Sequence, residues 1–229
     1  MSAPKPKITA WSFSRWNEYE TCPQRTHFKV NLKMKEPSGP ALERGTILHK
    51  QCEDYLRKGG KVPKELKLIE ATLKDYKKRG ALAEAEFTFD NAWKKTGWFD
   101  KNAWCRIKAD VTIPPIIDAD EPVVEIHDFK SGKLKDQYSE YGLQLDLYSL
   151  AGLLAYPTAK RARTSMVFID HGKVVPVENE YTQKDVKSLT KAWELRVKRM
   201  LNDTQFKPTP GDGCRWCSFS KSKGGMCAF

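Results

Sequence analysis

Three polar residues in the middle of the chain could act together on a phosphate ester. Asp110 lies on the polar face of one predicted strand, while Asp128 and Lys130 are two residues apart and share a face of the next. If the strands are neighbours, the two carboxylates can hold a divalent cation that acidifies a bound water. The nearby ammonium group can position that water and stabilise charge on the phosphate. The pattern therefore indicates metal-assisted hydrolysis of phosphodiester bonds.

The alternative is that the Asp-x-Lys pair is an ordinary solvated pair, since such pairs are common on strands. Its position favours a site instead. The strand is apolar up to Asp128, and Ser131-Gly132 ends it directly after Lys130. Polar residues at the carboxyl end of a central strand are where binding sites tend to form.

Four cysteines near the two ends of the chain could hold one metal ion or cluster: Cys22, Cys214, Cys217 and Cys227. The Cys-x2-Cys spacing of the second and third brings two thiolates onto one cation or cluster. Cys22 is the best candidate for the remaining ligand, because Cys52 and Cys105 lie in an apolar helix and strand and are expected in the core. The alternative is that the tail cysteines are free thiols. A bound metal would be a structural staple, since it would tie the two chain ends together.

Hydrophobic periodicity predicts the elements that must position these groups. Helical spacing or helix-end signals occur in residues 12–22, 41–58, 63–79, 138–155 and 183–202. Strand-like patterns occur in residues 84–90, 103–113, 123–130, 164–170 and 173–180. This order predicts an α/β fold, a mixed β-sheet flanked by helices, with N-terminal helices and a C-terminal metal-binding tail.

The length of 229 residues suits a single domain. We expect one nuclease domain over residues 1–229 with a core at about residues 41–181. The N-terminal helix, residues 12–22, and the tail, residues 205–229, would be joined by the four cysteines.

Four segments resemble, in chain order, the motifs of RecB-like nucleases in the PD-(D/E)XK superfamily. Residues 44–49 are similar to the Gly-x-x-x-His helix, and residues 108–110 to the Gly-x-x-Asp element, although the glycine of that element is absent. Residues 125–132 resemble the Asp-x-Lys-Thr-Gly signature, and residues 144–148 the Gln-x-x-x-Tyr helix. The resemblance implies a restriction-endonuclease-like core.

The resemblance also implies a role for each matching residue. The ligands of an active-site Mg²⁺ or Mn²⁺ would be His49, Asp110, Asp128 and the backbone carbonyl of Phe129. By residue type alone, His49 is more typical of a structural histidine, because it follows apolar helix residues. Lys130 would assist the attacking water. Gln144 and Tyr148 share a helical face and would lie near this lysine and the nucleic-acid backbone.

The cysteines resemble those of iron–sulfur RecB-like nucleases, including the CRISPR-associated exonuclease branch. In those proteins one N-terminal and three C-terminal cysteines hold a 4Fe-4S cluster. The spacing before Cys227 is longer here than in that branch. A tetrahedral Zn²⁺ would satisfy the same four thiolates, so both metals stay open.

The charge of the chain favours an anionic partner. There are 40 Lys and Arg residues against 29 Asp and Glu residues, which gives a formal charge of +11. Lys94 and Lys95 lie between Trp93 and Trp98, a combination that suits stacking on unpaired bases and neutralising phosphates. We therefore expect DNA, single-stranded or at duplex ends, as the partner.

No segment predicts contact with a membrane. The longest apolar stretch, about residues 143–156, is shorter than a bilayer requires. The Pro- and Lys-containing start has no apolar run behind it, so it does not resemble a secretory signal. We expect a cytoplasmic protein, in the host cytoplasm if a phage encodes it.

These observations favour an end-dependent exonuclease of recombination, repair or replication. It could act alone or with a recombination or helicase protein. One alternative is a sequence-specific or structure-specific endonuclease on the same fold. The other is a DNA-binding module without turnover, against which the intact set of Asp110, Asp128 and Lys130 argues.

Overall fold

A computed structural model describes residues 7–133, 138–176 and 180–229, with the side chains of residues 138–140 left out. The chain divides into two compact units. One contains Met1–Ser38 and Trp193–Phe229, and the other contains Gly39–Ala192. The expected nuclease core, residues 41–181, falls within the second unit.

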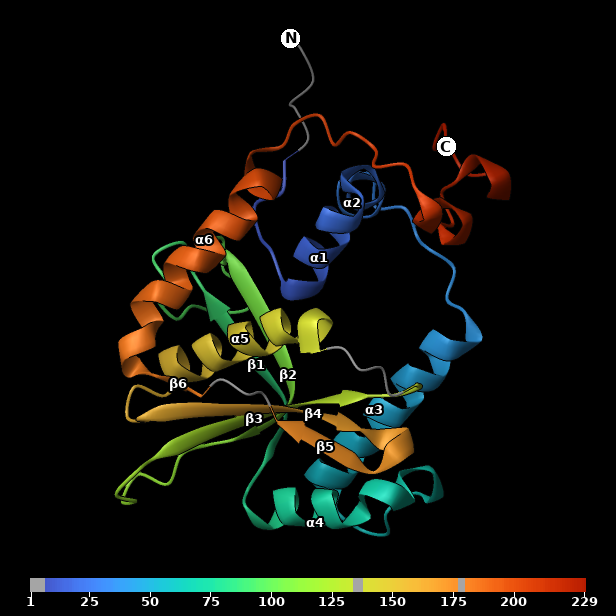
Figure 1. Cartoon of the computed structure of the whole chain (residues 1–229). Coiled ribbons are helices and arrows are strands. Elements are labelled where there is room, and N and C mark those ends of the chain that lie inside the picture. Colours follow the sequence, from blue (N-terminus) through green and yellow to red (C-terminus); the bar gives the residue numbers. More distant parts are fainter. Residues whose placement is uncertain (1–6, 134–137, 177–179) are drawn as a thin grey trace. The chain divides into compact units, whose positions relative to one another are not determined.

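A mixed sheet forms the centre of the second unit (Figure 1). Its strands are β1 Leu82–Phe89, β2 Cys105–Ile113, β3 Val123–Lys130, β4 Arg161–Phe168, β5 Lys173–Pro176 and β6 Tyr181–Thr182. The order is β1-β2-β3-β4-β5, with β6 also paired to β4. Strands β3 and β4 are parallel, and the other pairs are antiparallel. The predicted mixed β-sheet flanked by helices is confirmed.

Helices cover both faces of this sheet (Figure 1). On one face lie α3 Pro40–Lys58, the 3-10 helix η1 Lys64–Ile69 and α4 Glu70–Lys78, and on the other lies α5 Tyr138–Ala155. Helix α5 supplies the crossover that parallel pairing of β3 and β4 requires. It approaches β3 closely, because a Cβ atom at Gly152 would lie 3.0 Å from Val124.

The alternation of side chains along the strands explains how the two faces differ. On the α3 and α4 side, apolar side chains such as Leu48, Leu73, Val111, Phe129 and Val167 form a buried cluster. The residues between them point to the α5 side. Asp110, Asp128 and Lys130 are among these, so the polar groups of interest face α5 at the end of the sheet that α3 also reaches.

Several element boundaries differ from the predicted ones. The predicted helix 63–79 begins as a 3-10 helix, and the predicted strand 164–170 ends at Phe168, where the 3-10 helix η2 Ile169–His171 begins. Within the predicted strand 173–180, β5 ends at Pro176, and residues 177–179 lie outside the described residues. Helix α6 Val186–Asn202 is preceded by the 3-10 helix η3 Gln183–Asp185.

The unit that contains both chain ends includes two N-terminal helices, α1 Phe13–Thr21 and α2 Pro23–Val30. Ser12 caps α1 by accepting a hydrogen bond from the backbone N–H of Arg15. Helix α2 was not predicted from the sequence, although it begins at Pro23, a residue well suited to the first helical position. The tail forms only short 3-10 helices, η4 Asp212–Trp216 and η5 Lys221–Lys223.

Among the described residues, no helix combines the length and the apolar composition that crossing a bilayer would require.

An acidic pH should remove one specific contribution to the stability of the second unit. His127 Nε2 lies 3.5 Å, and Arg79 Nη2 2.6 Å, from the Glu125 carboxylate, and these partners lower the pKa of Glu125 to about 2. A lowered pKa stabilises the fold above the ordinary value of the carboxyl group, and the stabilisation is lost as the pH falls toward the folded-state value. We expect Glu125→Gln to cost about 1–2 kcal/mol near neutral pH, since part of the effect is screened by solvent.

Urea unfolding of the parent and of Glu125→Gln, measured from about pH 6 to about pH 3, quantifies this contribution. The difference in free energy of unfolding between the two proteins should shrink steadily as the pH falls. A difference that stays constant over this range would show that the Arg79–Glu125 pair does not stabilise the fold.

Candidate active site

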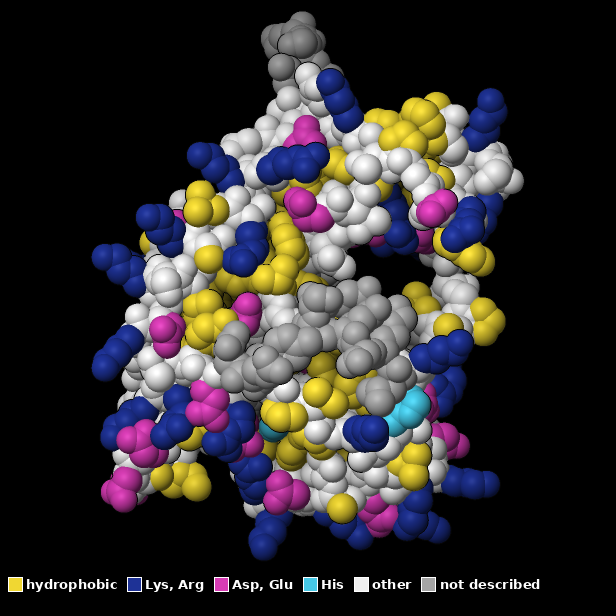
Figure 2. Space-filling model, in the orientation of Figure 1, with side chains coloured by type: hydrophobic (Ala, Val, Ile, Leu, Met, Phe, Trp, Pro, Cys, Tyr) yellow, Lys and Arg dark blue, Asp and Glu magenta, His cyan; other side chains and the backbone are white. Residues whose placement is uncertain are grey.

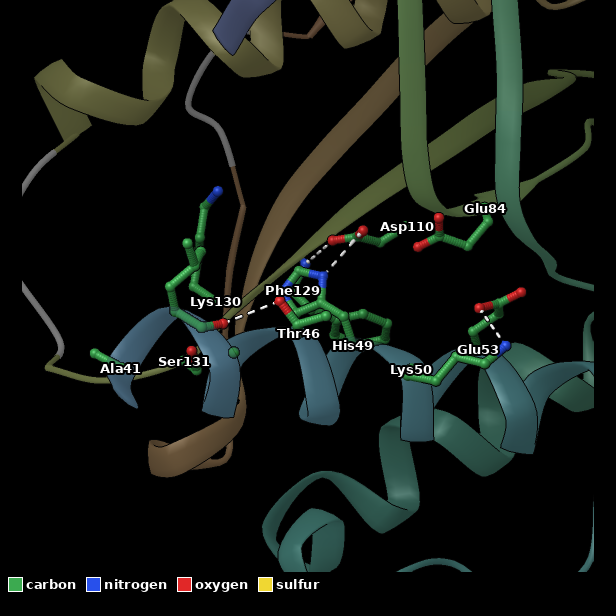
Figure 3. A pocket seen from close by; sticks show the side chains of 12 residues that line it. Ala41, Thr46, His49, Lys50, Glu53, Glu84, Asp110, Phe129, Lys130 and Ser131 are labelled. Carbon is green, nitrogen blue, oxygen red and sulfur yellow. Dashed lines mark hydrogen bonds and ion pairs between the residues drawn. The ribbon is translucent and has the colours of Figure 1, made fainter. Parts of the chain in front are cut away.

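The polar residues of β2, β3 and α3 surround one open cleft (Figure 3). Its volume is about 570 Å³. The polar or charged side chains that line it are Thr46, His49, Lys50, Glu53, Glu84, Asp110, Lys130 and Ser131. Phe129 lines it as well.

The register of β2 and β3 brings the two aspartates together. Val111 pairs with His127, and one further step along the antiparallel ladder places Asp110 opposite Asp128. Both side chains lie on the same face, and residues directly opposite in such a pair have Cβ atoms about 5 Å apart. The convergence expected from the sequence therefore follows from strand pairing alone.

Asp110 connects three elements. Its Oδ2 atom accepts a hydrogen bond of 2.7 Å from the backbone N–H of Phe129, and its Oδ1 atom lies 3.2 Å from Nδ1 of His49 on α3. These two contacts are visible in Figure 3 as dashed lines. The carboxylate is partly exposed to the cleft, so it can bind a cation while it remains fixed by its neighbours.

Asp128 lies deeper, with only 4% of its surface exposed. Lys130 Nζ is 2.6 Å from its Oδ2 atom, and its Oδ1 atom accepts hydrogen bonds from Gln144 Nε2 at 3.0 Å and the Tyr148 hydroxyl at 3.1 Å. Burial raises the pKa of Asp128 above its ordinary value, and the charge of Asp110 adds to this, while Lys130 opposes it. A cation beside Asp110 would favour the charged form of Asp128 in the same way as Lys130 does.

Gln144 and Tyr148 form the inner wall of this arrangement. Gln144 accepts a hydrogen bond of 3.2 Å from Lys130 and donates one of 2.9 Å to the Tyr148 hydroxyl. Burial raises the pKa of Tyr148, so its hydroxyl stays neutral and can donate to Asp128. The pair thus fixes the carboxylate and the ammonium group from the α5 side without lining the cleft itself.

Replacing Tyr148 by Phe should remove the hydroxyl donor to Asp128 while preserving the packing of the ring. We expect the cleavage rate to fall about tenfold, as is typical when a group that orients a metal ligand is lost. Tyr156→Phe, just beyond the end of the same helix, is the matched control and should cleave at the parental rate. Equal rates for parent and Tyr148→Phe would show that the hydroxyl does not contribute to cleavage.

His49 lies near the middle of α3, and its side chain lines the cleft. Burial disfavours the charged imidazole, but the hydrogen bond and charge of Asp110, with a further contribution from Asp128, raise the pKa of His49 above its ordinary value. A metal ion binds only the neutral ring, so cation binding at His49 competes with protonation of its imidazole.

A polar link outside the cleft holds α3 against the segment after β3. Arg44 on α3 contacts both carboxylate oxygens of Asp170, at 2.9 and 2.5 Å, and Asp170 accepts a hydrogen bond of 2.6 Å from the backbone N–H of Gly132. A Cβ atom at Gly45 would lie only 3.2 Å from Ser131 Oγ. This close approach keeps the helix bearing His49 next to the end of β3.

Glu84 lines the cleft although no sequence pattern pointed to it. By sequence, Glu53 and Glu86 are both typical of solvated carboxylates, and the structure places Glu53 and Glu84, but not Glu86, in the lining. In the register of β1 and β2, Glu84 falls opposite Asp110, and its carboxylate points toward Asp110, whose own carboxylate points toward His49 and Phe129 (Figure 3). Glu84 has a φ of +57°, a conformation that side chains rarely adopt and that is frequent at functional sites.

All the residues predicted for the catalytic site thus lie around one point of the second unit: His49, Asp110, Asp128, Phe129, Lys130, Gln144 and Tyr148. Within the described part of the chain, no three His, Cys, Asp or Glu side chains are already close enough to hold a metal ion. Asp128 is paired with Lys130 instead.

The four candidate cysteines lie around a second cleft, which belongs entirely to the unit of the chain ends. Its volume is about 400 Å³, and its lining includes Cys22, Cys214, Cys217 and Cys227. Cys227 Sγ is 3.1 Å from Gln24 Oε1, and the backbone N–H of Gly211 points to Cys214 Sγ at 3.4 Å. Among the described residues, no disulfide links any of the four.

Cys52 and Cys105 are buried in the other unit, as predicted. Burial raises the pKa of Cys52 to about 12 and also raises that of Cys105, so both behave as apolar core residues.

A model of the PD-(D/E)XK nuclease superfamily matches residues 10–222. The chain belongs to this superfamily. The match includes residues of both units.

Two solved structures share the superfamily fold with this chain. One is a protein designated SSO0001, with a TM-score of 0.51 and 16% identity over 97% of this chain and 87% of that one. The other is a "Putative exonuclease" from Eubacterium rectale, with a TM-score of 0.54 and 15% identity over 96% of this chain and 89% of that one. No curated protein sequence matches the chain.

Proposed function

We propose that this superfamily member is a DNA nuclease that requires Mg²⁺ or Mn²⁺ and degrades DNA from its ends. One observation carries the proposal. Asp110 on β2 lies opposite Asp128 on β3, and Lys130 at the end of β3 lines the cleft that His49 also lines. The structural neighbour described as an exonuclease supports the preference for ends.

The donor atoms at the cleft suit a hard divalent cation. Carboxylate oxygens of Asp110 and Asp128, a backbone carbonyl of Phe129 and an imidazole of His49 are ligands that Mg²⁺ and Mn²⁺ accept. A bound ion would acidify a water and offset negative charge on the scissile phosphate.

The residues of the chain would supply the remaining steps. Lys130 lies at the boundary between the buried Asp128 and the cleft, so its ammonium group can donate hydrogen bonds to the attacking water or to a phosphate oxygen. Gln144 and Tyr148 hold Asp128 and Lys130 in position from behind. Glu53 and Glu84 also line the cleft, where they are paired with Lys50 and Lys108.

The cysteine cleft is proposed to hold a 4Fe-4S cluster or, alternatively, Zn²⁺, as in the RecB-like branch. The fit rests on four thiols of different segments that line one cleft. Either metal would cross-link the segment before Pro23 to the tail and thereby stabilise a unit that otherwise has little regular structure at its C-terminal end.

DNA is the proposed substrate because the chain has a formal charge of +11. On the face shown in Figure 2, Lys and Arg side chains are spread widely, with acidic side chains among them. A recombination or helicase protein could deliver DNA ends to the cleft. This would give the nuclease a role in DNA recombination, repair or replication.

Incubation of the purified protein with linear and with covalently closed circular DNA, in Mn²⁺ or Mg²⁺, tests this proposal. We expect the linear DNA to be degraded and the circle to remain intact. Opening of the circle would identify an endonuclease, and survival of both would identify a DNA-binding module without turnover. Either of those outcomes would overturn the proposed end dependence.

A further inference from the structure

The β1–β2 hairpin ends in an unusually long connection, residues 90–104, that presents one aromatic side chain to solvent. Phe99 is 92% exposed, the highest value among the large apolar side chains described. A single exposed apolar residue is ordinary by itself. Long ordered loops in compact proteins, however, are usually functional, so the way this loop holds Phe99 is informative.

Internal hydrogen bonds fix the backbone on both sides of Phe99. The Asp100 carboxylate accepts hydrogen bonds from the Thr96 hydroxyl at 2.6 Å and the backbone N–H of Gly97 at 2.7 Å. The backbone N–H of Asp100 donates to the Gly97 carbonyl at 3.1 Å. A Cβ atom at Gly97 would lie 2.8 Å from the Asp100 carboxylate, so this turn closes tightly. Phe99 is therefore presented by a preorganised turn.

The base of the loop is anchored by packed aromatic rings. Trp93 was expected to stack on DNA, but it is only 8% exposed and packs against Phe89 and Trp104, so that expectation is wrong. The reason is a turn with a φ of +59° at Trp93, which folds the ring back onto the hairpin. Arg106 donates a hydrogen bond of 2.8 Å to the carbonyl of Trp98, which fixes the chain directly before Phe99.

The exposed charges of this loop are mainly positive. Lys94, Lys95 and Lys101 are exposed, and none of them forms an ion pair within the described residues. The two acidic side chains of the loop are occupied locally: Asp100 holds the turn, and Asp90 accepts hydrogen bonds from the backbone N–H groups of Ala92 and Lys94. A rigid exposed ring among unpaired ammonium groups matches the chemistry of a base flanked by phosphates.

We propose that Phe99 stacks on an unpaired base of the DNA substrate while the neighbouring lysines contact its phosphates. The proposal rests on the function proposed above, because it assigns part of the same substrate to this loop. Asp110 and Cys105 are five residues apart along β2, a distance of about 17 Å. Phosphates of a stacked strand advance about 3.4 Å each, so a strand that stays stacked along β2 places the base at the Phe99 loop about five nucleotides from the cleaved bond.

Equilibrium binding of fluorescent single strands of about 4 and about 12 nucleotides tests the proposal, since only the longer strand spans that distance. All proteins carry Lys130→Ala so that the DNA stays intact. Phe99→Ala should weaken binding of the longer strand about tenfold or more, and leave binding of the shorter strand unchanged. Phe99→Trp should bind the longer strand at least as tightly as the parent.

The matched control is Ile117→Ala, which removes a side chain that is 72% exposed in the connection between β2 and β3. It should not change binding of either strand. The inference is overturned if Phe99→Ala binds the longer strand like the parent, if both strand lengths lose affinity equally, or if Phe99→Trp binds as weakly as Phe99→Ala. This test measures binding without cleavage. If the parent protein fails to cleave linear DNA, that result refutes the nuclease proposal but leaves the test of Phe99 unaffected.

Discussion

Asp110→Ala is expected to lower the rate of cleavage of linear DNA by more than about a hundredfold. Asp110 contacts both His49 and the backbone of Phe129 and lines the open cleft, so its loss removes a carboxylate from the proposed metal position. Lys130→Ala should cause a loss of about the same size, because it removes the ammonium group next to Asp128. The measurement is the initial rate on end-labelled linear DNA in saturating Mn²⁺.

Glu86→Ala is the matched control for these variants. Glu86 lies on β1 two residues beyond Glu84, but it is exposed and does not line the cleft. Its rate should stay within about twofold of the parental rate, as is usual for a surface substitution. If Asp110→Ala and Lys130→Ala degrade DNA as fast as Glu86→Ala, the assignment of the catalytic residues is wrong.

Loss of one cysteine should destabilise the unit of the chain ends far more than loss of a neighbouring polar side chain. We expect Cys22→Ser to lower the free energy of unfolding of that unit by more than about 3 kcal/mol, because a structural metal contributes its binding energy to folding. Chelation of the proposed metal should produce the same loss in the parent. Thermal unfolding, combined with metal analysis of the purified protein, measures both effects.

Two further variants make this prediction specific. Ser218→Ala, next to Cys217, should melt like the parent. Adding Cys214→Ser to Cys22→Ser should cause little further loss, since the proposed shared metal would already be lost and such effects are not additive. Additive losses from the two substitutions, or an unchanged melting temperature for Cys22→Ser, would show that the thiols do not bind a common metal.

The central strands and their polar pair could be predicted because side-chain alternation is local. Asp128 and Lys130 share a face in any strand, and Ser131-Gly132 favours its end there. The register that places Asp110 opposite Asp128 could not be predicted, because it depends on the connection between β2 and β3, and a shift of one residue would turn Asp110 to the other face.

Backbone conformation explains which residues were missed or misjudged from the sequence. Glu84 and Trp93 both have positive φ values, which nothing in their residue types predicts. Glu84 within β1 presents its carboxylate to the cleft, and the turn at Trp93 buries a ring that the charge pattern had placed on the surface. Helix α2 was missed because residues 23–30 have no clear apolar stripe, although Pro23 provides a good start.

The central claim is that one divalent ion binds between Asp110, Asp128, His49 and the carbonyl of Phe129. Anomalous diffraction from crystals grown with Mn²⁺ tests it directly. The account predicts a strong peak within bonding distance of Asp110 and Asp128, next to Lys130, which has moved away from Asp128. Crystals of an active protein that bind Mn²⁺ elsewhere, with Lys130 still paired to Asp128, would contradict it.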